Sequence, residues 1–581
     1  MKVIHRIGKE HLERDIDGDP GFLLANRTGS YLFLKSGPRS RFHGYFYYGS
    51  DMFRIIENIE PLGCGPVTGI VNGFSYAERL RAGIRERFSL HGRKAMMYRL
   101  SSPADIEISL DIKASYDNRE FGRNYQISQE RDCIVISFIK STDPREDQSG
   151  GVEELSLHLA IRPDQMNAEK VEKWVKRTYA DDQARNSPPW TRYVYVPLRL
   201  KARSIAFSVS ESKKEAIQDV RSSMAHKEHG LAGGEIPNPS VHMAYLCSVN
   251  SLCSLAVGEI GVFAGLPWFF QFWIRDEAIS ARALRLLGLK RLSSRLVMSR
   301  MKSIGPDGRI AKEGSAEADG TGWVFRRIAD MMGSLSKGER RKIQDRLEHS
   351  IYLLEKFRSE NGFEKNRDKE TWMDSEYGND TRSGIRIEIQ CLRMAMYKLM
   401  TELSGGSRYL KLEKRLKART ARHFWCNGCL KDGLHDPTVR PNIFLAAYLS
   451  PCLLSKERWT KCFDTAIERL WLPWGGFATI DKEHPLYCNE HTGQDPRSYH
   501  RGDSWFWINN LAALVLFRHD RLRYGKYITK IMQASTEEIL WRGAIGHHAE
   551  LSSARELRSE GCAAQAWSAA MYIELVHEIF A

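Results

Sequence analysis

Acidic and aromatic side chains occur together at junctions between predicted loops and helices in the C-terminal half of the chain. The first junction, Gly265–Leu287, has Trp268 and Trp273 just ahead of Arg275 and Asp276, and then continues as an apolar helical pattern. Flat rings beside fixed charges suit a sugar, which offers apolar C–H faces and a rim of hydroxyl groups. The same pattern also fits an aromatic core cluster followed by acids that favour a helix N-terminus.

Similar junctions recur along the chain, and each taken alone fits a capped helix end. Together they predict an acidic, aromatic-lined cleft. They supply the remaining candidate site residues: Asp319 and Trp323; Trp372, Asp374 and Glu376; Glu388; Arg440 and Asn442; His500, Trp505 and Trp507; Glu550; and Gln565 and Trp567.

Other kinds of catalytic site lack their defining motifs in this sequence. No GxSxG, GxxxxGK[ST] or HExxH pattern occurs, which excludes the serine-hydrolase, nucleotide-loop and zinc-peptidase templates. The lone pair Cys426 and Cys429 cannot fill a structural zinc shell, and the adjacent His547 and His548 lie in a predicted solvated loop. We therefore expect no metal and no cofactor. A pair of carboxylates remains, which is the minimum needed to cleave a glycoside.

Composition indicates a soluble protein of two or three domains. The chain has 581 residues, 42% apolar and 27% charged. Its start has no apolar segment typical of a secretory signal, and its longest apolar runs, such as Leu511–Phe517, are too short to cross a membrane. The eleven cysteines show no framework spacing. This usage favours reduced thiols, so we expect a cytoplasmic protein.

The net charge of +14 raises nucleic-acid binding as a rival function. Nucleic-acid-binding proteins concentrate Lys and Arg on one stripe or tail. Here the basic residues are spread along the chain, and the densest run, Lys411–Arg422, alternates basic with apolar residues as a solvated helix face does. We expect non-specific affinity for polyanions at most, and no dedicated nucleic-acid partner.

Residues 1 to about 210 have the pattern of a β-sandwich domain. Short runs rich in Tyr, Phe, Val and Ile recur between turn residues, many with the period of two that half-buried strands show. The predicted strands are Tyr31–Leu34, Phe42–Tyr48, Arg87–Tyr98, Asp105–Ala114, Asp132–Ile139, Leu155–Ile161, Arg192–Leu200 and Arg203–Ser210. Residues 211–240 are predicted to be a connection, with a charged helix up to His229 and a Gly/Pro-rich segment, Gly230–Pro239.

Residues 241–581 have a helical pattern. We predict about twelve helices, beginning near residues 240, 275, 290, 322, 338, 385, 408, 440, 455, 503, 521 and 563. In the most regular of them, Ile385–Met400, apolar residues recur at spacings of four and three. Twelve helices with long polar loops at alternate connections fit six helical hairpins closed into a ring.

Five motifs carry a resemblance to a known family. Pro267-Trp268 with Trp273-x-Arg275-Asp276, Thr371–Asp374, Arg440–Asn442, Tyr499–Trp507 and Gly561–Ser568 occur in the order and spacing of the amylo-α-1,6-glucosidase part of glycogen debranching enzymes. The resemblance covers nearly all of residues 240–581. Asn26–Tyr31 and Arg41–Gly44 resemble the domain that precedes the barrel in prokaryotic members. The family implies a multidomain fold, with an N-terminal antiparallel β-sandwich followed by an (α/α)6 barrel.

The resemblance also implies an activity, the hydrolysis of α-glucosidic bonds with inversion, on glycogen-derived or related α-glucans. Asp374 matches the family's general acid, and Glu550 falls where its base is expected. The acid must stay protonated, which burial against Trp372 and Tyr377 would favour, and the base must be ionised. Further implied roles are binding of glucose hydroxyls by Arg275 and Asp276, and walls for the sugar formed by Trp268, Trp323, Trp505 and Trp507.

Each catalytic carboxylate has competitors nearby in the sequence. Glu376 stands in a wetter setting than Asp374, and Glu388 falls in a first helical turn, where the helix dipole would lower its pKa. Asp503 and Glu556 compete with Glu550, which is preferred through the family match. The chain departs from the family's usual pattern around these positions, with Arg501, Asp503 and Ser504 in the His500 motif, and Ala549 and Leu551 flanking Glu550.

Two other functions remain open from the sequence. A glucoamylase- or trehalase-like enzyme on the same barrel would also pair an Arg-Asp with two carboxylates. A barrel that binds carbohydrate without catalysis is the alternative from another class, because fold and pocket do not establish chemistry.

Overall fold

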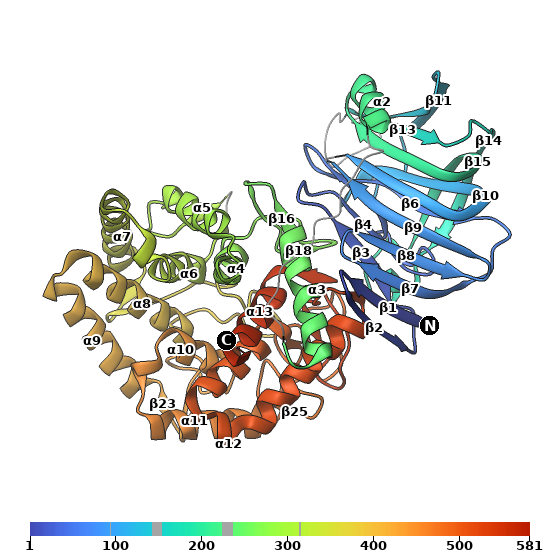
Figure 1. The fold of residues 1–581 in the computed structure, drawn as a ribbon. Helices are drawn as coiled ribbons and strands as arrows, with labels where there is room; N and C mark the ends of the chain where they lie inside the picture. Colours follow the sequence, from blue (N-terminus) through green and yellow to red (C-terminus); the bar gives the residue numbers. More distant parts are fainter. Residues whose placement is uncertain (93, 142–153, 223–235, 313–314, 581) are drawn as a thin grey trace. The chain divides into compact units, whose positions relative to one another are not determined.

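The computed structural model describes residues 1–92, 94–141, 154–222, 236–312 and 315–580, and the chain forms two compact units. The first unit comprises Met1–Gly258 and Ile539–His547, and the second Glu259–Glu538 and His548–Ala581 (Figure 1). Of the predicted connection at 211–240, residues 223–235 lie outside the described residues. The helix that follows, α3 (Pro239–Leu255), groups with the first unit.

The first unit is a large β structure. Its strands are β1 (Lys2–Ile7), β2 (Glu10–Asp15), β3 (Gly21–Ala25), β4 (Tyr31–Leu34), β5 (Gly44–Tyr48), β6 (Met52–Pro61), β7 (Val67–Gly73), β8 (Tyr76–Arg81), β9 (Ile84–His91), β10 (Ala95–Ala114), β11 (Arg123–Gln129), β12 (Ile134–Ser141), β13 (Glu154–Pro163), β14 (Ala168–Thr178), β15 (Thr191–Ser210) and β28 (Ala544–Ile545). The unit also contains α1 (Ala180–Ala184), α2 (Lys213–Ser222), α3 and β16 (Ala256–Val257).

The strands hydrogen-bond in the order β2-β1-β7-β8-β9-β10-β6-β5-β4-β3-β28. A branch leaves at β10, which also pairs with β15, and β15 continues to β14 and to β13, β12 and β11. Nearly all neighbours are antiparallel, and apolar side chains from both branches share one core. Ile106, Ile108, Leu110 and Ile112 of β10 are completely buried, which matches their period-two pattern.

One predicted strand of this unit was wrong. The run Arg87–Tyr98 is split between β9 and β10, because the chain turns at Gly92, which has a positive φ of 56°. The predicted strands Asp105–Ala114 and Arg203–Ser210 are the second halves of the long strands β10 and β15.

The second unit is helical. Its helices are α4 (Ile274–Leu286), α5 (Lys290–Arg300), α6 (Ala318–Ala329), α7 (Lys337–Phe357), α8 (Ile387–Ser404), α9 (Ser407–His423), α10 (Asn442–Leu449), α11 (Lys456–Leu470), α12 (Phe506–Trp541) and α13 (Ala566–Phe580). α12 contains a break at Asp520, whose φ and ψ are −161° and 91°. With α3 and the two halves of α12 counted separately, the described residues from 239 onward form twelve α-helices, each starting within four residues of its predicted position.

Alternate helices of this unit form two layers (Figure 1). α13, α4, α6, α8 and α10 contact one another in succession, whereas α5, α7, α9 and α11 pack against members of that series. The layers follow from the sequence. All eight residues of α10 are buried, as an inner helix requires, whereas α7, α9 and α11 bury one stripe and expose charged residues on the other.

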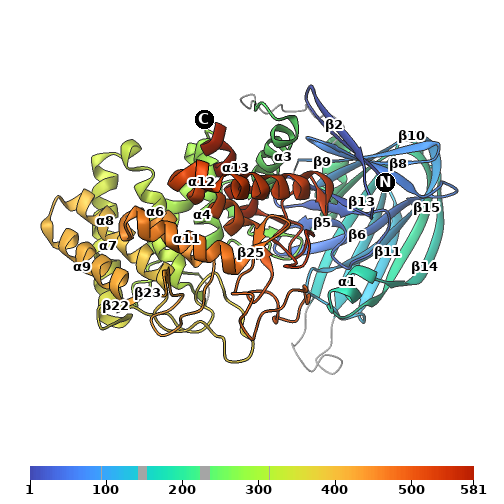
Figure 2. The same ribbon diagram turned by 90° about the horizontal axis from the view of Figure 1, so that it is seen from below.

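Long loops join the helices on one side of the unit, the lower side in Figure 2. Two-residue strand pairs tie distant loops together: β27 (Ser504–Trp505) pairs with β29 (Leu551–Ser552), and β18 (Gly265–Leu266) pairs with β30 (Ala564–Gln565). The other short strands are β17 (Gly261–Val262), β19 (Ala311–Lys312), β20 (Ser315–Ala316), β21 (Ser359–Glu360), β22 (Phe363–Glu364), β23 (Trp425–Cys426), β24 (Cys429–Leu430), β25 (Trp471–Leu472) and β26 (Gly476–Phe477). Among the described residues, no helix is long and apolar enough to cross a membrane.

Candidate active site

Arg275 lies at the centre of a group of carboxylates in the helical unit. It occupies the first turn of α4, and its Nε donates to both carboxylate oxygens of Asp319, at 2.9 and 3.0 Å. Its Nη1 lies 3.5 Å from Asp374 Oδ2, and its backbone N–H donates to Glu317 Oε2 at 3.1 Å. Burial raises the pKa of Glu317 to about 7, against the opposing charge of Arg275. The guanidinium of Arg275 therefore contacts two acids, Asp319 of α6 and Asp374 of a separate loop, and its backbone N–H binds a third, Glu317.

Asp276 is the neighbouring acid, and it is also buried. Gln565 Nε2 donates to Asp276 Oδ1 at 3.2 Å, a contact that the pairing of β18 with β30 makes possible because it places Gln565 opposite Gly265. Burial raises the pKa of Asp276 well above its ordinary value. Four acids thus lie at or beside the start of α4: Asp276, Glu317, Asp319 and Asp374. Together they can accept hydrogen bonds from several hydroxyl groups.

Asp374 lies on the loop between β22 and α8, and its side chain is 45% exposed. His500 Nε2 lies 3.4 Å from Asp374 Oδ1, on the other side of the carboxylate from Arg275. Burial lowers the pKa of His500 to about 4, so the ring is neutral at neutral pH, and only its Nε2–H tautomer can donate to a carboxylate. Loss of water to the surrounding protein acts to raise the pKa of Asp374. The hydrogen bond with His500 and the charge of Arg275 have the larger combined effect, so the pKa lies below its ordinary value.

Glu550 is almost completely buried. The Tyr499 hydroxyl donates to its Oε1, and the backbone N–H of Cys562 donates to its Oε2 at 2.8 Å. The adjacent pairing of β27 with β29 holds this segment beside the Tyr499 loop. Burial raises the pKa of Glu550 to about 7, although both hydrogen bonds act to lower it.

These surroundings differ from those predicted for an acid at Asp374 and a base at Glu550. We predicted that burial against Trp372 and Tyr377 would keep Asp374 protonated, and this was wrong: its side chain is partly exposed and lies next to a cation. Of the two carboxylates Glu550 has the higher pKa, because burial raises its pKa whereas the contacts with His500 and Arg275 lower that of Asp374.

Three of the four tryptophans predicted as sugar walls are buried, and two of them, Trp505 and Trp507, belong to a packed cluster of rings. Trp323, Trp505 and Trp507 are at most 2% exposed, so none of them presents a ring face on which a sugar could stack. The ring of Trp372 packs nearly perpendicular to those of His500, Trp505 and Trp507, with ring centroids 5.0–5.6 Å apart. The ring of His500 stacks on Trp505 at 4.9 Å, and Trp507 stacks on Trp567 at 4.9 Å. This cluster fixes the imidazole that faces Asp374.

Solvent reaches the two tryptophans of the first junction, Trp268 and Trp273. Trp273, directly before α4, is 37% exposed, and Trp268 is half-buried. Tyr377, three residues after Asp374, is also 37% exposed.

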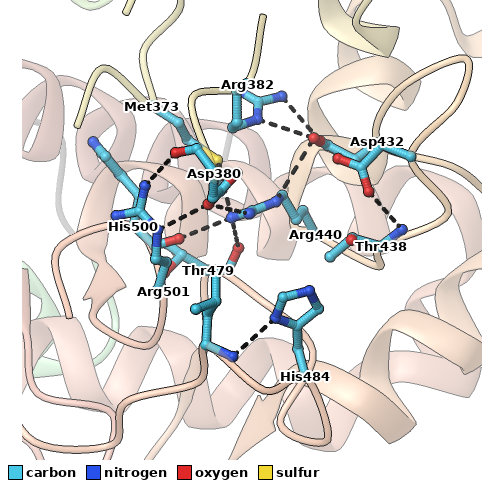
Figure 3. A network of polar contacts seen from close by, with 12 residues as sticks. Met373, Asp380, Arg382, Asp432, Thr438, Arg440, Thr479, His484, His500 and Arg501 are labelled. Carbon is cyan, nitrogen blue, oxygen red and sulfur yellow. Dashed lines mark hydrogen bonds and ion pairs between the residues drawn. The ribbon is translucent and has the colours of Figure 1, made fainter. Parts of the chain in front are cut away.

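Arg440, Asn442 and Glu388 belong to a buried network next to the Asp374 loop. Asn442 accepts from Trp372 Nε1 at 2.7 Å and donates to Asp432 at 2.7 Å. Asp432 also pairs with Arg382 at 2.9 Å (Figure 3). Glu388 is completely buried and pairs with Arg382 at 2.9 Å; burial raises its pKa, which contradicts our prediction that the helix dipole would lower it.

The competing acids lie in different settings. Glu376 is exposed and pairs with Lys369 at 3.0 Å, and Glu556 is exposed and contacts Arg558. Asp503 is completely buried, where it accepts from Ser498 Oγ and faces His491 Nδ1, both at 2.8 Å. The segment Tyr499-His500 contacts Glu550 and Asp374 through its side chains, whereas the contacts described for the three competing acids come from other residues.

Sequence reasoning omitted several residues of this site. Tyr499 stood in a recognised motif, directly before His500, and that position was the available signal. Glu317 carried no such signal, because an acid ahead of a helix is common. Arg501 and Asp380 were also missed, since their contacts join segments more than 100 residues apart.

Comparison with known proteins agrees with the family resemblance. Residues 323–574 match the family model described as amylo-alpha-1,6-glucosidase, which confirms the resemblance over that range and supports a glycoside hydrolase. No protein of curated function matches the chain in sequence.

Among solved structures, a bacterial glucoamylase complexed with acarbose is similar with a TM-score of 0.59 and 10% sequence identity, over 100% of this chain and 98% of that chain. A GH63 mannosylglycerate hydrolase from Thermus thermophilus, in complex with Tris, gives a TM-score of 0.45 with 12% identity, over 57% of this chain and 99% of that chain. The first likeness extends along the whole chain. The predicted fold class, an N-terminal β-sandwich followed by an (α/α)6 barrel, is confirmed.

Proposed function

We propose that this protein is an inverting α-glucosidase of the amylo-α-1,6-glucosidase type, which releases glucose from glycogen-derived or related α-glucans. Asp374 and Glu550 are its catalytic carboxylates. The observation that carries this proposal is the segment Tyr499-His500, whose two side chains contact Glu550 and Asp374 respectively, next to the acids around Arg275. The match of residues 323–574 to the family model supports the same reaction class.

The reaction requires one proton donor and one proton acceptor on opposite faces of the sugar. Asp374 gives its proton to the glycosidic oxygen as the bond from that oxygen to the anomeric carbon breaks. A water attacks the anomeric carbon from the other face and loses its proton to Glu550. The product is the β-anomer of glucose, and Asp374 is left ionised while Glu550 is left protonated.

The carboxylate that has to act as base, Glu550, has the higher pKa of the two, so it takes up the first proton that the free pair binds. Transfer of that proton to Asp374 is therefore part of forming the reactive complex. A bound sugar would displace water from the exposed Asp374 carboxylate, and loss of water raises a carboxylate's pKa. The two carboxylates titrate as a pair, so the active form is the one that carries a single proton.

Recognition of the terminal glucose is assigned to the group around Arg275. Asp276 and Asp319 accept hydrogen bonds from hydroxyls, and Gln565 and Arg275 hold these acids in place. Trp268, one of the predicted walls, and Trp273 have solvent access, so these two rings are proposed to contact the sugar in place of the buried Trp323, Trp505 and Trp507.

The two carboxylates and the Arg275 group supply the parts that inverting hydrolysis needs, so the proposal includes no metal and no cofactor. We also propose a cytoplasmic location, in keeping with its eleven cysteines, all of them free thiols.

A substrate panel tests the function. The purified protein is incubated with maltose, isomaltose, panose, trehalose and a glycogen limit dextrin, with the double variant Asp374→Asn/Glu550→Gln as control. We expect hydrolysis of the α-1,6-linked substrates by the wild type alone, with β-glucose as the first anomer seen by proton NMR. Preference for maltose or trehalose would instead assign a glucoamylase- or trehalase-like activity. Binding of the dextrin without hydrolysis of any substrate would indicate a carbohydrate-binding barrel.

A further inference from the structure

The loop that follows Asp374 has little burial to hold it in place. In the segment Ser375–Asp380, the residues from Glu376 to Asn379 are exposed, and Ser375 and Asp380 are half-buried. A loop with so little buried surface gains its shape from specific hydrogen bonds or not at all. Asp374 immediately precedes this segment, so the conformation of the segment sets the direction in which the Asp374 carboxylate points.

Arg501 supplies such hydrogen bonds at both ends of the segment. Its Nη2 donates to the Ser375 carbonyl at 2.9 Å and to the Asp380 carbonyl at 2.7 Å. Its Nη1 lies 3.3 Å from Ser375 Oγ and donates to the Pro496 carbonyl at 3.1 Å. Its Nε lies 2.9 Å from Asp380 Oδ2. One completely buried guanidinium therefore contacts five oxygen atoms, four of them on Ser375 and Asp380.

A second arginine holds the same acid and connects it to the His500 segment. Arg440 Nη2 donates to Asp380 Oδ2 at 2.8 Å, and its Nη1 donates to the carbonyls of His500 at 2.8 Å and Thr479 at 3.2 Å. Figure 3 shows Arg440 and Arg501 on either side of Asp380. The Asp374 loop and the segment that contacts both catalytic carboxylates are thus joined through Asp380.

We propose that Arg501 is a positioning residue for Asp374: by bracketing Ser375 and Asp380 it fixes the loop so that the Asp374 carboxylate faces the reacting bond. The inference rests on the proposed function, because it assumes that Asp374 acts in catalysis. The contacts of Arg501 fall on Ser375, Asp380 and Pro496, so it acts through the loop. The planar fork of a guanidinium can serve these oxygens together, whereas the point charge of a lysine cannot.

The test compares Arg501→Gln and Arg501→Lys with a matched control, Arg393→Gln. Arg393 is a buried arginine of α8 that lies 3.5 Å from Glu364. We expect Arg501→Gln to lower kcat by about 10- to 100-fold with a much smaller change in KM, since a misplaced catalytic group costs turnover of that order. Arg501→Lys keeps a charge beside Asp380 and should recover only part of the loss. The control should keep the wild-type kcat whatever its effect on Tm.

Hydrogen–deuterium exchange gives a readout that does not depend on activity. Amides of residues 375–382 should exchange faster in Arg501→Gln than in the wild type or in Arg393→Gln. Unchanged kcat in an active, folded Arg501→Gln protein would overturn the inference and leave the proposed function standing. Unchanged exchange of the loop would overturn it even if kcat fell. A wild-type protein inactive on every substrate would overturn the proposed function, and with it the role assigned to Arg501.

Discussion

Tyr499 and His500 are neighbours in the chain, yet each contacts a different one of the two candidate catalytic carboxylates. The Tyr499 hydroxyl donates to Glu550, and His500 Nε2 lies 3.4 Å from Asp374. The two rings lie 4.7 Å apart, centroid to centroid, so a single turn of the chain reaches both acids. Any change in this loop therefore affects both halves of the proposed reaction.

The first prediction concerns the two carboxylates themselves. Asp374→Asn and Glu550→Gln should each reduce kcat by roughly two to four orders of magnitude, the usual effect of removing a catalytic acid or base. Binding of a glucan, measured by calorimetry, should survive both changes. Glu376→Gln is the control, because Glu376 is exposed and pairs with Lys369. Near-normal turnover in Glu550→Gln together with loss of activity in Asp503→Asn or Glu556→Gln would show that the base is misassigned.

The second prediction is the pH dependence of kcat/KM. The pKa of Glu550 is raised to about 7 and that of Asp374 is lowered, so the form with one shared proton is populated between these two values. Activity should therefore fall as the pH rises through about 7, when the pair loses its last proton, and should persist well into the acidic range. A profile that instead rises through pH 7 and stays high in alkaline solution would contradict the proton placement.

The third prediction tests the hydrogen bond from Tyr499. Its hydroxyl lowers the pKa of Glu550, against the larger effect of burial. Tyr499→Phe should therefore move the alkaline limb of the kcat/KM profile to higher pH and lower kcat by about 10-fold or more, since a hydrogen bond to a charged group is lost. A lower kcat with an unmoved alkaline limb would mean that Tyr499 acts on the substrate and not on Glu550.

The fourth prediction concerns stability. Burial raises the pKa of Glu317 from 4.5 to about 7, so the native state binds more protons than the unfolded state between these values. Its contribution to stability is present below pH 4.5 and is lost as the pH rises through 7. Glu317→Gln should therefore be more stable than the wild type above pH 7, by about 1 kcal/mol or more, as measured by urea unfolding. The exposed Glu376→Gln should show no such difference, and a destabilised Glu317→Gln at pH 8 would contradict the argument.

The fifth prediction concerns metals. The acids of the site already accept hydrogen bonds from protein groups, namely Arg275, Gln565, His500 and backbone N–H groups. Treatment with EDTA should therefore leave the turnover unchanged, as measured on the best substrate of the panel. Activity that disappears with the chelator and returns with an added divalent ion would contradict a metal-independent mechanism.

The sequence by itself determined the order of the α-helices in the second half of the chain. Counting helical segments placed the start of each of the twelve α-helices within four residues, and the most regular of them, Ile385–Met400, shows why: a helix that buries one face repeats apolar side chains at a spacing of about 3.6 residues. Periodicity was less reliable in the β unit, where the break at Gly92 depends on a single residue with positive φ.

Arg275, Asp374 and His500 lie in motifs that the sequence shows, whereas Glu550 was chosen mainly through the resemblance to a family. What only the tertiary structure decided is the environment of each side chain. Trp505 and Trp507 are buried, Asp374 is exposed beside a cation, and Glu550 is enclosed. Burial and charge depend on segments that lie more than 100 residues apart in the chain, such as Arg501 and Asp380. The spacing of residues along the sequence carries no information about those contacts. It therefore cannot predict the pKa of a side chain or whether an aromatic ring is exposed to solvent.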